Sequence, residues 1–305
     1  MRPPVSHEIK EFVSQRRFDN APSPRQDHGC PKLTIVTPSF NQAQFLERTI
    51  LSVLNQRYPE LEYIIIDGGS TDGSVEIIKK YERWLACWVS ERDAGQSDAL
   101  NKGFRRASGE LVGWQNSDDI YLPGTFREVA EMFVAQPACD IVFANRLDVD
   151  EADNVIGESR FTPFSVVGHW YDGMSLSNQS TFWRRNLFAK IGMIDDSYHL
   201  AMDYEFFLRA ARKHARFKHV RRYWGASRKH GSSKESTLFA TRMAPECDRV
   251  DQMYGGKTRW ALPLKVYALV RRCFYYLWQG DWDYVARGLG RRGRQLIERL
   301  RLRSS

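Results

Sequence analysis

Two adjacent carboxylates, Asp118 and Asp119, follow an apolar run that begins at Leu111 and passes through Trp114. This pattern predicts a buried strand that ends in an acidic pair. Hard divalent cations such as Mg²⁺ and Mn²⁺ prefer carboxylate oxygens, and substrate phosphates often complete their coordination. In an open α/β sheet, ligands collect at the carboxyl ends of the strands. The pair is therefore a candidate cation and phosphate site, with a turn or helix cap as the alternative interpretation.

Two earlier segments repeat this strand-and-turn pattern. The apolar run 33–37 breaks at Pro38, and the run 63–66 enters the turn 67–73. Each predicts a strand that is followed by a helix. After the first strand, apolar residues recur at helical spacing, and Asn41 is expected to be the N-cap. This alternation predicts an α/β fold with a mostly parallel central sheet that is flanked by helices.

The composition fits a folded protein that faces the cytosol. A chain of 305 residues with 42% hydrophobic content can hold one large domain, or one domain with appendages. Its five cysteines are dispersed and odd in number, which supports neither a disulfide framework nor a zinc site. No apolar segment follows the first methionine, so we expect no secretory signal. The apolar stretch 262–278 contains Pro263 and three basic residues and falls short of the ~20 apolar residues of a membrane span.

The formal charge of +8 is concentrated near the end of the chain. From Arg287 onward, seven arginines and Glu298 give a net charge of +6. This argues against a nucleic-acid-binding face on the body and for a separate basic appendage. Aromatic and basic residues between 262 and 282 suit a helix at the surface of an anionic leaflet, whereas packing onto the core is the alternative. We therefore expect a cytoplasmic protein that is peripheral on the inner face of the cytoplasmic membrane.

Six short motifs carry a resemblance to a known family. They are Thr-Pro-Ser-Phe-Asn at 37–41, Asp-Gly-Gly-Ser-Thr-Asp-Gly-Ser at 67–74, Asp-Ala-Leu-Asn-Lys-Gly at 98–103, Ser-Gly-Glu at 108–110, Asn-Ser-Asp-Asp at 116–119 and Met-Asp-Tyr-Glu at 202–205. Over roughly residues 32–240, the chain resembles a family 2 inverting glycosyltransferase with the GT-A fold. The resemblance implies transfer of a sugar from a nucleotide-diphosphate donor, with a UDP-sugar expected. The acceptor would be a hydroxyl of a glycan or a lipid-linked molecule in surface polysaccharide biosynthesis.

The resemblance and the charge pattern together divide the chain into four parts. These are a polar leader (1–31) with one short helix, a Rossmann-like nucleotide-sugar-binding half (32–145), an acceptor-binding and catalytic half (146–240), and a basic, aromatic, helical C-terminal extension (241–305). Within the catalytic half we expect a hairpin across 148–159, a helix at 203–214 and a mobile loop at 231–234.

The resemblance implies a donor site at the strand ends. Pro38 and Phe40 match positions that pack on the base, and Asp67 lies in the acidic loop beside it. Asp118 would face the ribose, and Asp119, with Asp118, would hold the Mg²⁺ or Mn²⁺ that bridges the diphosphate. Such a cation stabilises the developing charge of the leaving group. The other expected donor contacts are Thr37, Asn41, Gly69, Asp98, Asn101, Lys102, Asn116 and His230, the last in a loop that resembles a lid over the diphosphate.

One departure from the family pattern concerns the base. Many relatives have an aspartate that reads uracil in the loop after the second strand, whereas this chain has Gly68 at that position. The assignment of a sugar nucleotide is therefore firmer than the assignment of uridine. A solvated polar face is the alternative interpretation of Asp98, Asn101 and Lys102, which fall on about one helical turn.

Asp203 matches the catalytic base of the family. It would remove the proton of the acceptor hydroxyl, which attacks the anomeric carbon from the face opposite the diphosphate and inverts its configuration. The alternative is that Asp203 only stabilises the start of a helix through the helix dipole. The residues expected to line an acceptor pocket are His169, Trp170, Gln179 and Trp183, although aromatic side chains there also suit a core.

Two other classes of function remain open at this point. The first is a nucleotide-sugar-binding protein without turnover, against which the presence of both Asp119 and Asp203 speaks. The second is a dinucleotide-dependent oxidoreductase on a doubly wound sheet. This chain lacks the Gly-x-Gly-x-x-Gly turn that such an enzyme needs after the first strand, because 38–41 reads Pro-Ser-Phe-Asn.

Overall fold

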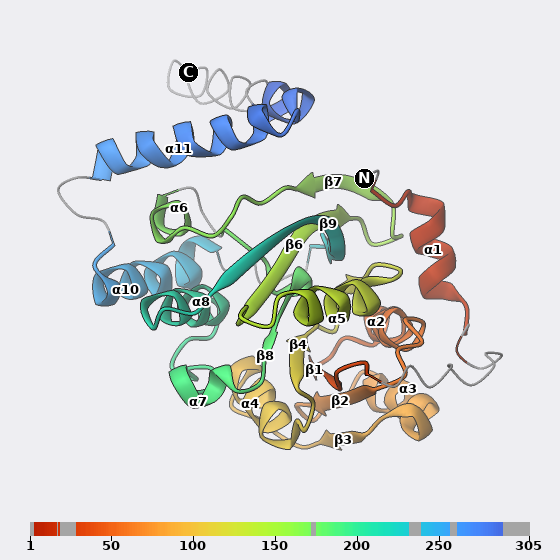
Figure 1. Cartoon of the computed structure of the whole chain (residues 1–305). Coiled ribbons are helices and arrows are strands. Elements are labelled where there is room, and N and C mark those ends of the chain that lie inside the picture. Colours follow the sequence, from red (N-terminus) through yellow and green to blue (C-terminus); the bar gives the residue numbers. More distant parts are fainter. Residues whose placement is uncertain are drawn as a thin grey trace, which may run out of the picture. The chain divides into compact units, whose positions relative to one another are not determined.

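The fold is given by a computed structural model of the chain. It describes residues 3–16, 18, 29–171, 175–231, 239–256 and 261–288. The chain divides into two compact units, which Figure 1 traces along the sequence. The first unit comprises Met1–Phe164 and Leu176–Gly256, and the second comprises Ser165–Ser175 and Lys257–Ser305.

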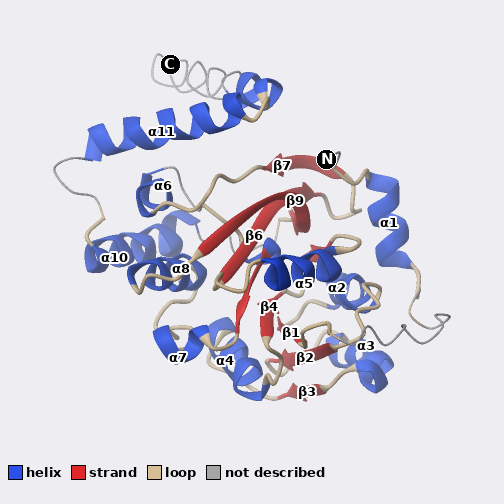
Figure 2. Cartoon of the chain, in the orientation of Figure 1, coloured by secondary structure: helices blue, strands red, loops and turns tan. Residues whose placement is uncertain are grey.

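A nine-stranded sheet forms the centre of the first unit (Figure 2). The strands are β1 (Leu33–Ser39), β2 (Leu61–Asp67), β3 (Cys87–Ser90), β4 (Leu111–Trp114), β5 (Ile120–Tyr121), β6 (Ile141–Val149), β7 (Val155–Ser159), β8 (Thr181–Arg184) and β9 (Phe217–Arg228). Their order is β3-β2-β1-β4-β8-β6-β9-β5, with β7 paired to β6. The β3-β2-β1-β4 part and the β6-β9 pair are parallel, whereas β8 is antiparallel to both neighbours. The expected α/β sheet is confirmed, and its second half is mixed.

Helices cover both faces of this sheet. They are α1 (Ser6–Ser14), α2 (Ala43–Leu54), α3 (Ser74–Tyr81), α4 (Gln96–Arg106), α5 (Thr125–Ala135), α7 (Leu187–Ile191), α8 (Met202–Arg212) and α10 (Ala244–Tyr254), with the short turns η1 (Glu82–Trp84), η2 (Asn178–Ser180) and η3 (Phe239–Met243). Side chains alternate along a strand, so Ile35 joins the core shared with α2, α3 and α5, and Val36 meets α4 on the other face. The approach of α4 requires Gly103, because a Cβ there would lie 2.3 Å from Val36 Cγ1.

α1 packs into the first unit and is not part of a separate polar leader. Ile9, Phe12 and Val13 are buried against apolar residues of β5, β6 and β9. Their spacing of three and four residues forms the single apolar stripe of an otherwise polar helix. The Asn55 side chain fixes the end of the helix by donating to the carbonyl oxygens of Phe12 and Gln15 at 2.5 and 2.8 Å.

The start of α2 differs from the prediction. The N-cap position belongs to Gln42, and Asn41 takes a left-handed conformation with φ of +51°. The backbone N–H of Ala43 instead donates to Asp72 Oδ2 at 2.9 Å, and that of Asn41 donates to Ser70 Oγ at 2.8 Å. A neighbouring loop therefore satisfies the free N–H groups at this helix start.

The expected C-terminal extension, 241–305, divides between the two units. α10 belongs to the first unit, because the Tyr204 hydroxyl of α8 donates to Asp251 and the Tyr254 hydroxyl donates to Glu205, both at 2.7 Å. The second unit contains α6 (Val166–Tyr171) and α11 (Ala261–Trp278). Residues 289–305, and the expected loop 231–234 apart from Gly231, lie outside the described residues.

Candidate functional site

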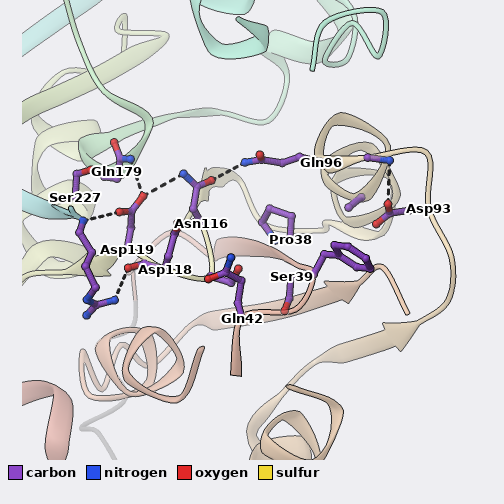
Figure 3. A pocket seen from close by; sticks show the side chains of 15 residues that line it. Pro38, Ser39, Gln42, Asp93, Gln96, Asn116, Asp118, Asp119, Gln179 and Ser227 are labelled. Carbon is purple, nitrogen blue, oxygen red and sulfur yellow. Dashed lines mark hydrogen bonds between the residues drawn. The ribbon is translucent and has the colours of Figure 1, made fainter. Parts of the chain in front are cut away.

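A cavity of about 250 Å³ lies at the carboxyl ends of β1 and β4. Figure 3 shows the side chains that line it. They are Pro38, Ser39, Phe40, Gln42, Asp93, Gly95, Gln96, Ala99, Asn116, Ser117, Asp118, Asp119, Gln179, Ser227 and Arg228. Six expected site residues are among them: Pro38, Phe40, Asn116, Asp118, Asp119 and Gln179. The cavity occupies the edge of the sheet where the strand ends were expected to bind a ligand.

Asp119 is the buried member of the acidic pair, with 3% of its surface exposed. Its Oδ1 accepts the backbone N–H of Arg228 at 2.9 Å, and its Oδ2 accepts Gln179 Nε2 at 2.7 Å and Asn116 Nδ2 at 3.1 Å (Figure 3). Burial and then the Asp118 carboxylate raise the pKa of Asp119 to about 6, against the opposing effect of these hydrogen bonds. The site therefore holds a carboxylate whose ionisation a nearby cation would favour.

His230 lies beside the acidic pair. Its Nε2 lies 3.1 Å from Asp118 Oδ2, and its ring packs 4.6 Å from that of Phe45. No group of three or more Asp, Glu, His or Cys side chains in the described part of the chain could hold a metal ion. Ions such as Mg²⁺ are usually held by one or two carboxylates together with phosphates and water, so the chemistry of Asp118 and Asp119 suits such an ion.

The backbone of the acidic loop is held from α2 and β9. The Thr49 hydroxyl donates to the carbonyl oxygens of Ser117 and Asp119 at 2.9 and 2.7 Å. The Arg228 guanidinium donates to the carbonyl oxygen of Asp118. These bonds use backbone acceptors, so they fix the loop without consuming its carboxylates. The pair is therefore preorganised before any ligand binds.

Asp93 supplies a third carboxylate to the cavity, at a place the sequence analysis missed. Its Oδ1 accepts the Gly95 N–H at 2.9 Å. A Cβ at Gly68 would lie 2.6 Å from Asp93 Oδ2, so this carboxylate occupies the space that a side chain at 68 would need. Phe40, 59% exposed, also lines the cavity. The sequence contained part of the information needed to find Asp93, because this residue follows β3, whose carboxyl end lies at the same edge of the sheet as the end of β2.

The expected donor residues Thr37, Asp67 and Gly69 do not line the cavity. Asp67 is fully buried, and its carboxylate accepts the N–H groups of Gly69 and Ser70 and the Ser90 hydroxyl. The Thr37 hydroxyl is buried 3.0 Å from the Tyr63 hydroxyl. Asp67 therefore organises its turn, and the cavity carboxylate on this side comes from Asp93.

The three expected donor contacts on α4 fasten this helix to its neighbours. Asn101 is buried and exchanges two hydrogen bonds with the backbone of Ile194. Lys102 pairs with Glu91 at 3.1 Å and with Asp98 at 3.3 Å, and Asp98 also accepts the Ala94 N–H. These contacts account for the polar face of α4 without a ligand.

Asp203 lies partly buried in the first turn of α8 and does not line the cavity. The segment before this helix is held by Glu246 of α10, whose carboxylate accepts the N–H groups of His199, Leu200 and Ala201 at 2.9–3.1 Å. Burial opposes the ionisation of Glu246, but these backbone bonds outweigh it and lower its pKa. A Cβ at Gly95, on the cavity wall, would lie 3.6 Å from His199 Nδ1. The segment that leads into α8 therefore lies beside the cavity.

The four expected acceptor residues lie in different surroundings. Trp183 is fully buried, with its ring 5.3 Å from Phe206 and 6.0 Å from Trp114, so it packs the core and we assign it no acceptor contact. Gln179 lines the cavity and holds Asp119. His169, which is buried, and Trp170 belong to α6 of the second unit.

The comparisons with known proteins agree with this arrangement. A model of glycosyl transferase family 2 matches residues 34–209, which is more than half of the chain. An uncharacterized glycosyltransferase of Mycobacterium tuberculosis is 34% identical over 187 residues, covering 60% of this chain and 70% of the relative. The putative teichuronic acid biosynthesis glycosyltransferase TuaG of Bacillus subtilis is 34% identical over 116 residues, covering 37% of this chain and 46% of the relative.

Solved structures show the same fold at low sequence identity. S. aureus TarS 1–349 in complex with UDP-GlcNAc has a TM-score of 0.55 and 18% identity, covering 78% of this chain and 79% of that one. The mannosyltransferase PcManGT from Pyrobaculum calidifontis, in complex with GDP-Man and Mn²⁺, has the same score and identity, covering 88% and 81%. The chain therefore belongs to glycosyl transferase family 2, and it is a glycosyltransferase with a GT-A type fold.

Proposed function

We propose that this glycosyltransferase uses a divalent cation to move a sugar, with inversion, from a nucleotide-diphosphate donor to a hydroxyl of a glycan or lipid-linked acceptor. The observation that supports this most directly is the acidic pair in the lining of the cavity, which Phe40 and Asp93 also line. A donor whose base packs on Phe40 can place its diphosphate near Asp118 and Asp119. The family assignment sets aside the oxidoreductase alternative.

The acidic pair would bind Mg²⁺ or Mn²⁺ together with the donor phosphates. Such a cation stabilises the negative charge that develops on the leaving diphosphate. This chain contributes Asp119 in a fixed orientation, because Gln179, Asn116 and the Arg228 N–H hold its two oxygens. His230 lies beside Asp118 and would help to position it. The Mn²⁺ in the PcManGT complex is consistent with this proposal.

Asp203 would act as the general base. Its carboxylate would accept the proton of the acceptor hydroxyl as the oxygen bonds to the anomeric carbon from the face opposite the diphosphate. The bond from that carbon to the diphosphate breaks in the same step, so the configuration is inverted. Asp203 lies in the first turn of α8, four residues after His199, which is beside the cavity wall, and this position supports the role.

The donor is proposed to be a UDP-sugar that is read through Asp93. A carboxylate accepts a hydrogen bond from the N3–H of uracil, and Phe40 offers a ring on which a base can stack. Asp93 fills the space beside Gly68. Many members of the family that the chain resembles have, at the position of Gly68, the aspartate that reads uracil. TarS was solved with UDP-GlcNAc and PcManGT with GDP-Man, which makes uracil and guanine the two bases to compare.

Nucleotide binding tests this proposal. With Mn²⁺ present, UDP is expected to raise the melting temperature more than CDP does, because cytosine N3 is an acceptor and has no proton for Asp93. Asp93→Asn should weaken UDP binding by ~10–100-fold, which corresponds to the ~1.5–3 kcal/mol of a charge-assisted hydrogen bond, and it should narrow the difference from CDP. Glu91→Gln, in the same loop but outside the cavity, is the matched control.

Three results would change the donor proposal. A preference for GDP would assign guanine, whose N1–H and amino group can both donate to a carboxylate. Equal UDP affinity for the wild type and Asp93→Asn would remove Asp93 from base recognition. Failure of every nucleotide diphosphate and nucleotide sugar to stabilise the wild type with Mn²⁺ would contradict the donor site itself, since a ligand at 100 times its Kd should stabilise by ~2.7 kcal/mol.

Surface polysaccharide biosynthesis is the proposed setting, supported by the name of the TuaG relative. We propose further that α11 holds the enzyme on the inner face of the cytoplasmic membrane. Five of its apolar side chains recur every four residues and are 53–74% exposed: Leu262, Val266, Val270, Phe274 and Trp278. All charged residues of α11 are basic, and residues 287–305 carry a net charge of +6. An apolar stripe with basic neighbours suits an anionic leaflet.

Within the described residues, no helix is long and apolar enough to span a bilayer. Sedimentation with vesicles therefore tests surface binding. At low salt, the wild type should sediment with vesicles that contain phosphatidylglycerol and less with pure phosphatidylcholine. Val270→Ser/Phe274→Ser/Trp278→Ser should stay in the supernatant, whereas Ile156→Ser, which removes an exposed apolar side chain from β7, should not change binding. Equal sedimentation of the triple variant and the wild type would exclude the stripe as the docking surface.

A further inference from the structure

We propose that Asp153 is a positioning residue for the cation site: it holds the Arg228 guanidinium away from the carboxylates of Asp118 and Asp119, so that a divalent cation can bind there. The inference rests on the proposed cation-dependent function. It concerns a residue in the turn between β6 and β7, in the second half of the sheet and outside the motifs of the sequence.

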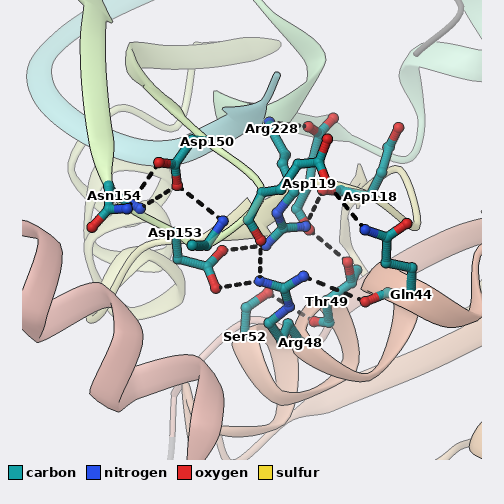
Figure 4. A network of polar contacts seen from close by, with 12 residues as sticks. Gln44, Arg48, Thr49, Ser52, Asp118, Asp119, Asp150, Asp153, Asn154 and Arg228 are labelled. Carbon is teal, nitrogen blue, oxygen red and sulfur yellow. Dashed lines mark hydrogen bonds and ion pairs between the residues drawn. The ribbon is translucent and has the colours of Figure 1, made fainter. Parts of the chain in front are cut away.

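Asp153 lies between two arginines (Figure 4). Its Oδ2 is 2.7 Å from Arg48 Nη1 of α2, and its Oδ1 contacts Arg228 Nη2 of β9. The exposed fraction of the side chain is 0% for Arg228, 5% for Asp153 and 25% for Arg48. The three residues form an ionic chain, buried at Asp153 and Arg228 and partly exposed at Arg48, in which two guanidinium groups share one carboxylate.

Arg228 reaches the acidic loop at two points. Its backbone N–H donates to Asp119 Oδ1 at 2.9 Å, and its Nη1 donates to the Asp118 carbonyl oxygen. Its Nε is buried and has no hydrogen-bond partner within the described structure. In the described part of the chain, Asp153 is therefore the one carboxylate that pairs with the Arg228 guanidinium. The acidic loop that this guanidinium also contacts carries two more carboxylates, those of Asp118 and Asp119.

A guanidinium forms its strongest contacts with carboxylates, and a buried one that loses its partner turns toward the nearest anion. Without the Asp153 charge, that anion is Asp118 or Asp119. An arginine paired with either group would occupy an oxygen that the cation needs and would place a positive charge beside it. Asp153 prevents this competition while Arg228 still supports the backbone of the acidic loop.

The turn that presents Asp153 is built independently of Arg228. Asp153 has a left-handed backbone with φ of +61°, a conformation that Asp and Asn tolerate better than most residues. Asp150 closes the turn by accepting the N–H groups of Ala152 and Asn154 at 2.9 and 2.8 Å, and the Asn154 side chain at 2.8 Å. Asp150→Asn is therefore a matched control, because it removes a charge from the same turn without contacting Arg228.

Direct titration of Mn²⁺ into the UDP-bound protein, followed by the paramagnetic resonance signal of free Mn²⁺, measures cation affinity without sugar transfer. Asp153→Asn keeps the shape and the backbone preference of the residue. We expect it to bind Mn²⁺ ~10–100-fold more weakly, the usual range for the loss of a group that orients metal ligands. Asp150→Asn should bind close to the wild type, and circular dichroism should show that both variants are folded.

A second substitution separates positioning from general support of the fold. Arg228→Gln alone leaves Asp153 paired with Arg48 but removes the guanidinium bond to the Asp118 carbonyl oxygen, so it should weaken Mn²⁺ binding less than Asp153→Asn does. In Asp153→Asn/Arg228→Gln the competing charge is gone, so affinity should return toward that of Arg228→Gln. A purely structural role predicts additive losses in this cycle.

The outcomes distinguish the positioning role from the cation site itself. If Asp153→Asn binds Mn²⁺ as tightly as the wild type, Asp153 has no positioning role. The same conclusion follows if the double variant binds Mn²⁺ as weakly as Asp153→Asn or more weakly. Neither result would contradict the cation site itself. Absence of Mn²⁺ binding by the wild type with UDP would overturn both.

Discussion

Replacement of Asp203 by Asn is expected to lower the turnover of sugar transfer by ~10²–10⁴ while nucleotide affinity stays near that of the wild type. The substitution keeps the size of the side chain and one oxygen, which can still accept the Tyr204 N–H as Asp203 Oδ1 does at 2.8 Å. It removes the basicity needed to take the acceptor proton. Asp203 does not line the nucleotide cavity, so UDP binding with Mn²⁺ should survive. Steady-state kinetics and nucleotide-dependent thermal shifts measure the two effects separately.

Asp196→Asn provides the control for this substitution. Asp196 is an exposed carboxylate on the loop before α8, so its loss changes the local charge by the same amount without altering the proposed base. Its kinetics should match the wild type. If Asp203→Asn instead loses nucleotide binding and keeps its turnover at saturating donor, Asp203 is a donor ligand and another residue is the base.

Asp119→Ala is expected to abolish transfer and the Mn²⁺-dependent part of donor binding. The substitution removes the buried carboxylate around which Gln179, Asn116 and the Arg228 N–H are arranged, so the cation loses its principal protein ligand. Wild-type enzyme in excess chelator should be equally inactive, and added Mg²⁺ or Mn²⁺ should restore it. Activity assays with and without chelator measure this. Full activity of the variant, or of chelated wild type, would exclude the cation mechanism.

Thermal melting of Asp119→Ala at several pH values tests both the loss of the Asp119 carboxylate and the retention of the fold. The pKa of Asp119 is raised in the folded state from 3.8 to about 6, so in this interval the folded chain binds more protons than the unfolded chain. The free energy of unfolding without cation should therefore fall as pH rises through this window. The alanine variant lacks this contribution, and its melting temperature should depend less on pH. A non-cooperative transition at every pH would indicate that the variant has lost its fold.

The sequence predicted the strand-turn-helix succession because each step depends on local chemistry. The runs that became β1 and β2 end in turn residues, and apolar spacing defines α2 and α8. The location of the acidic pair followed from the same argument, since parallel strands bring their carboxyl ends to one edge of the sheet. The hairpin expected at 148–159 is confirmed as the antiparallel β6-β7 pair.

The remaining parts of the site depend on contacts between distant segments. Asp67 and Asp93 both follow strands, and only the packed structure decides that Asp67 turns into its own loop while Asp93 fills the space at Gly68. A tryptophan such as Trp183 suits a pocket or a core equally well, and its strand placed it in the core between Trp114 and Phe206. Arg228 and Asp153 meet because β6 and β9 are neighbours, which their separation in the sequence does not indicate.

The three backbone N–H groups that Glu246 holds have a consequence for where this enzyme can be divided. The family match ends at residue 209, and a boundary placed at 240 from the composition would discard α10 and with it the Glu246 carboxylate. The segment that leads into α8 would then lose its anchor, although every residue of the nucleotide cavity would remain. We therefore expect the shortest active fragment to extend through Gly256, where the first unit ends. A fragment cut earlier is expected to keep the cavity and to misplace Asp203, the proposed base, so nucleotide binding alone would not show that the enzyme is complete.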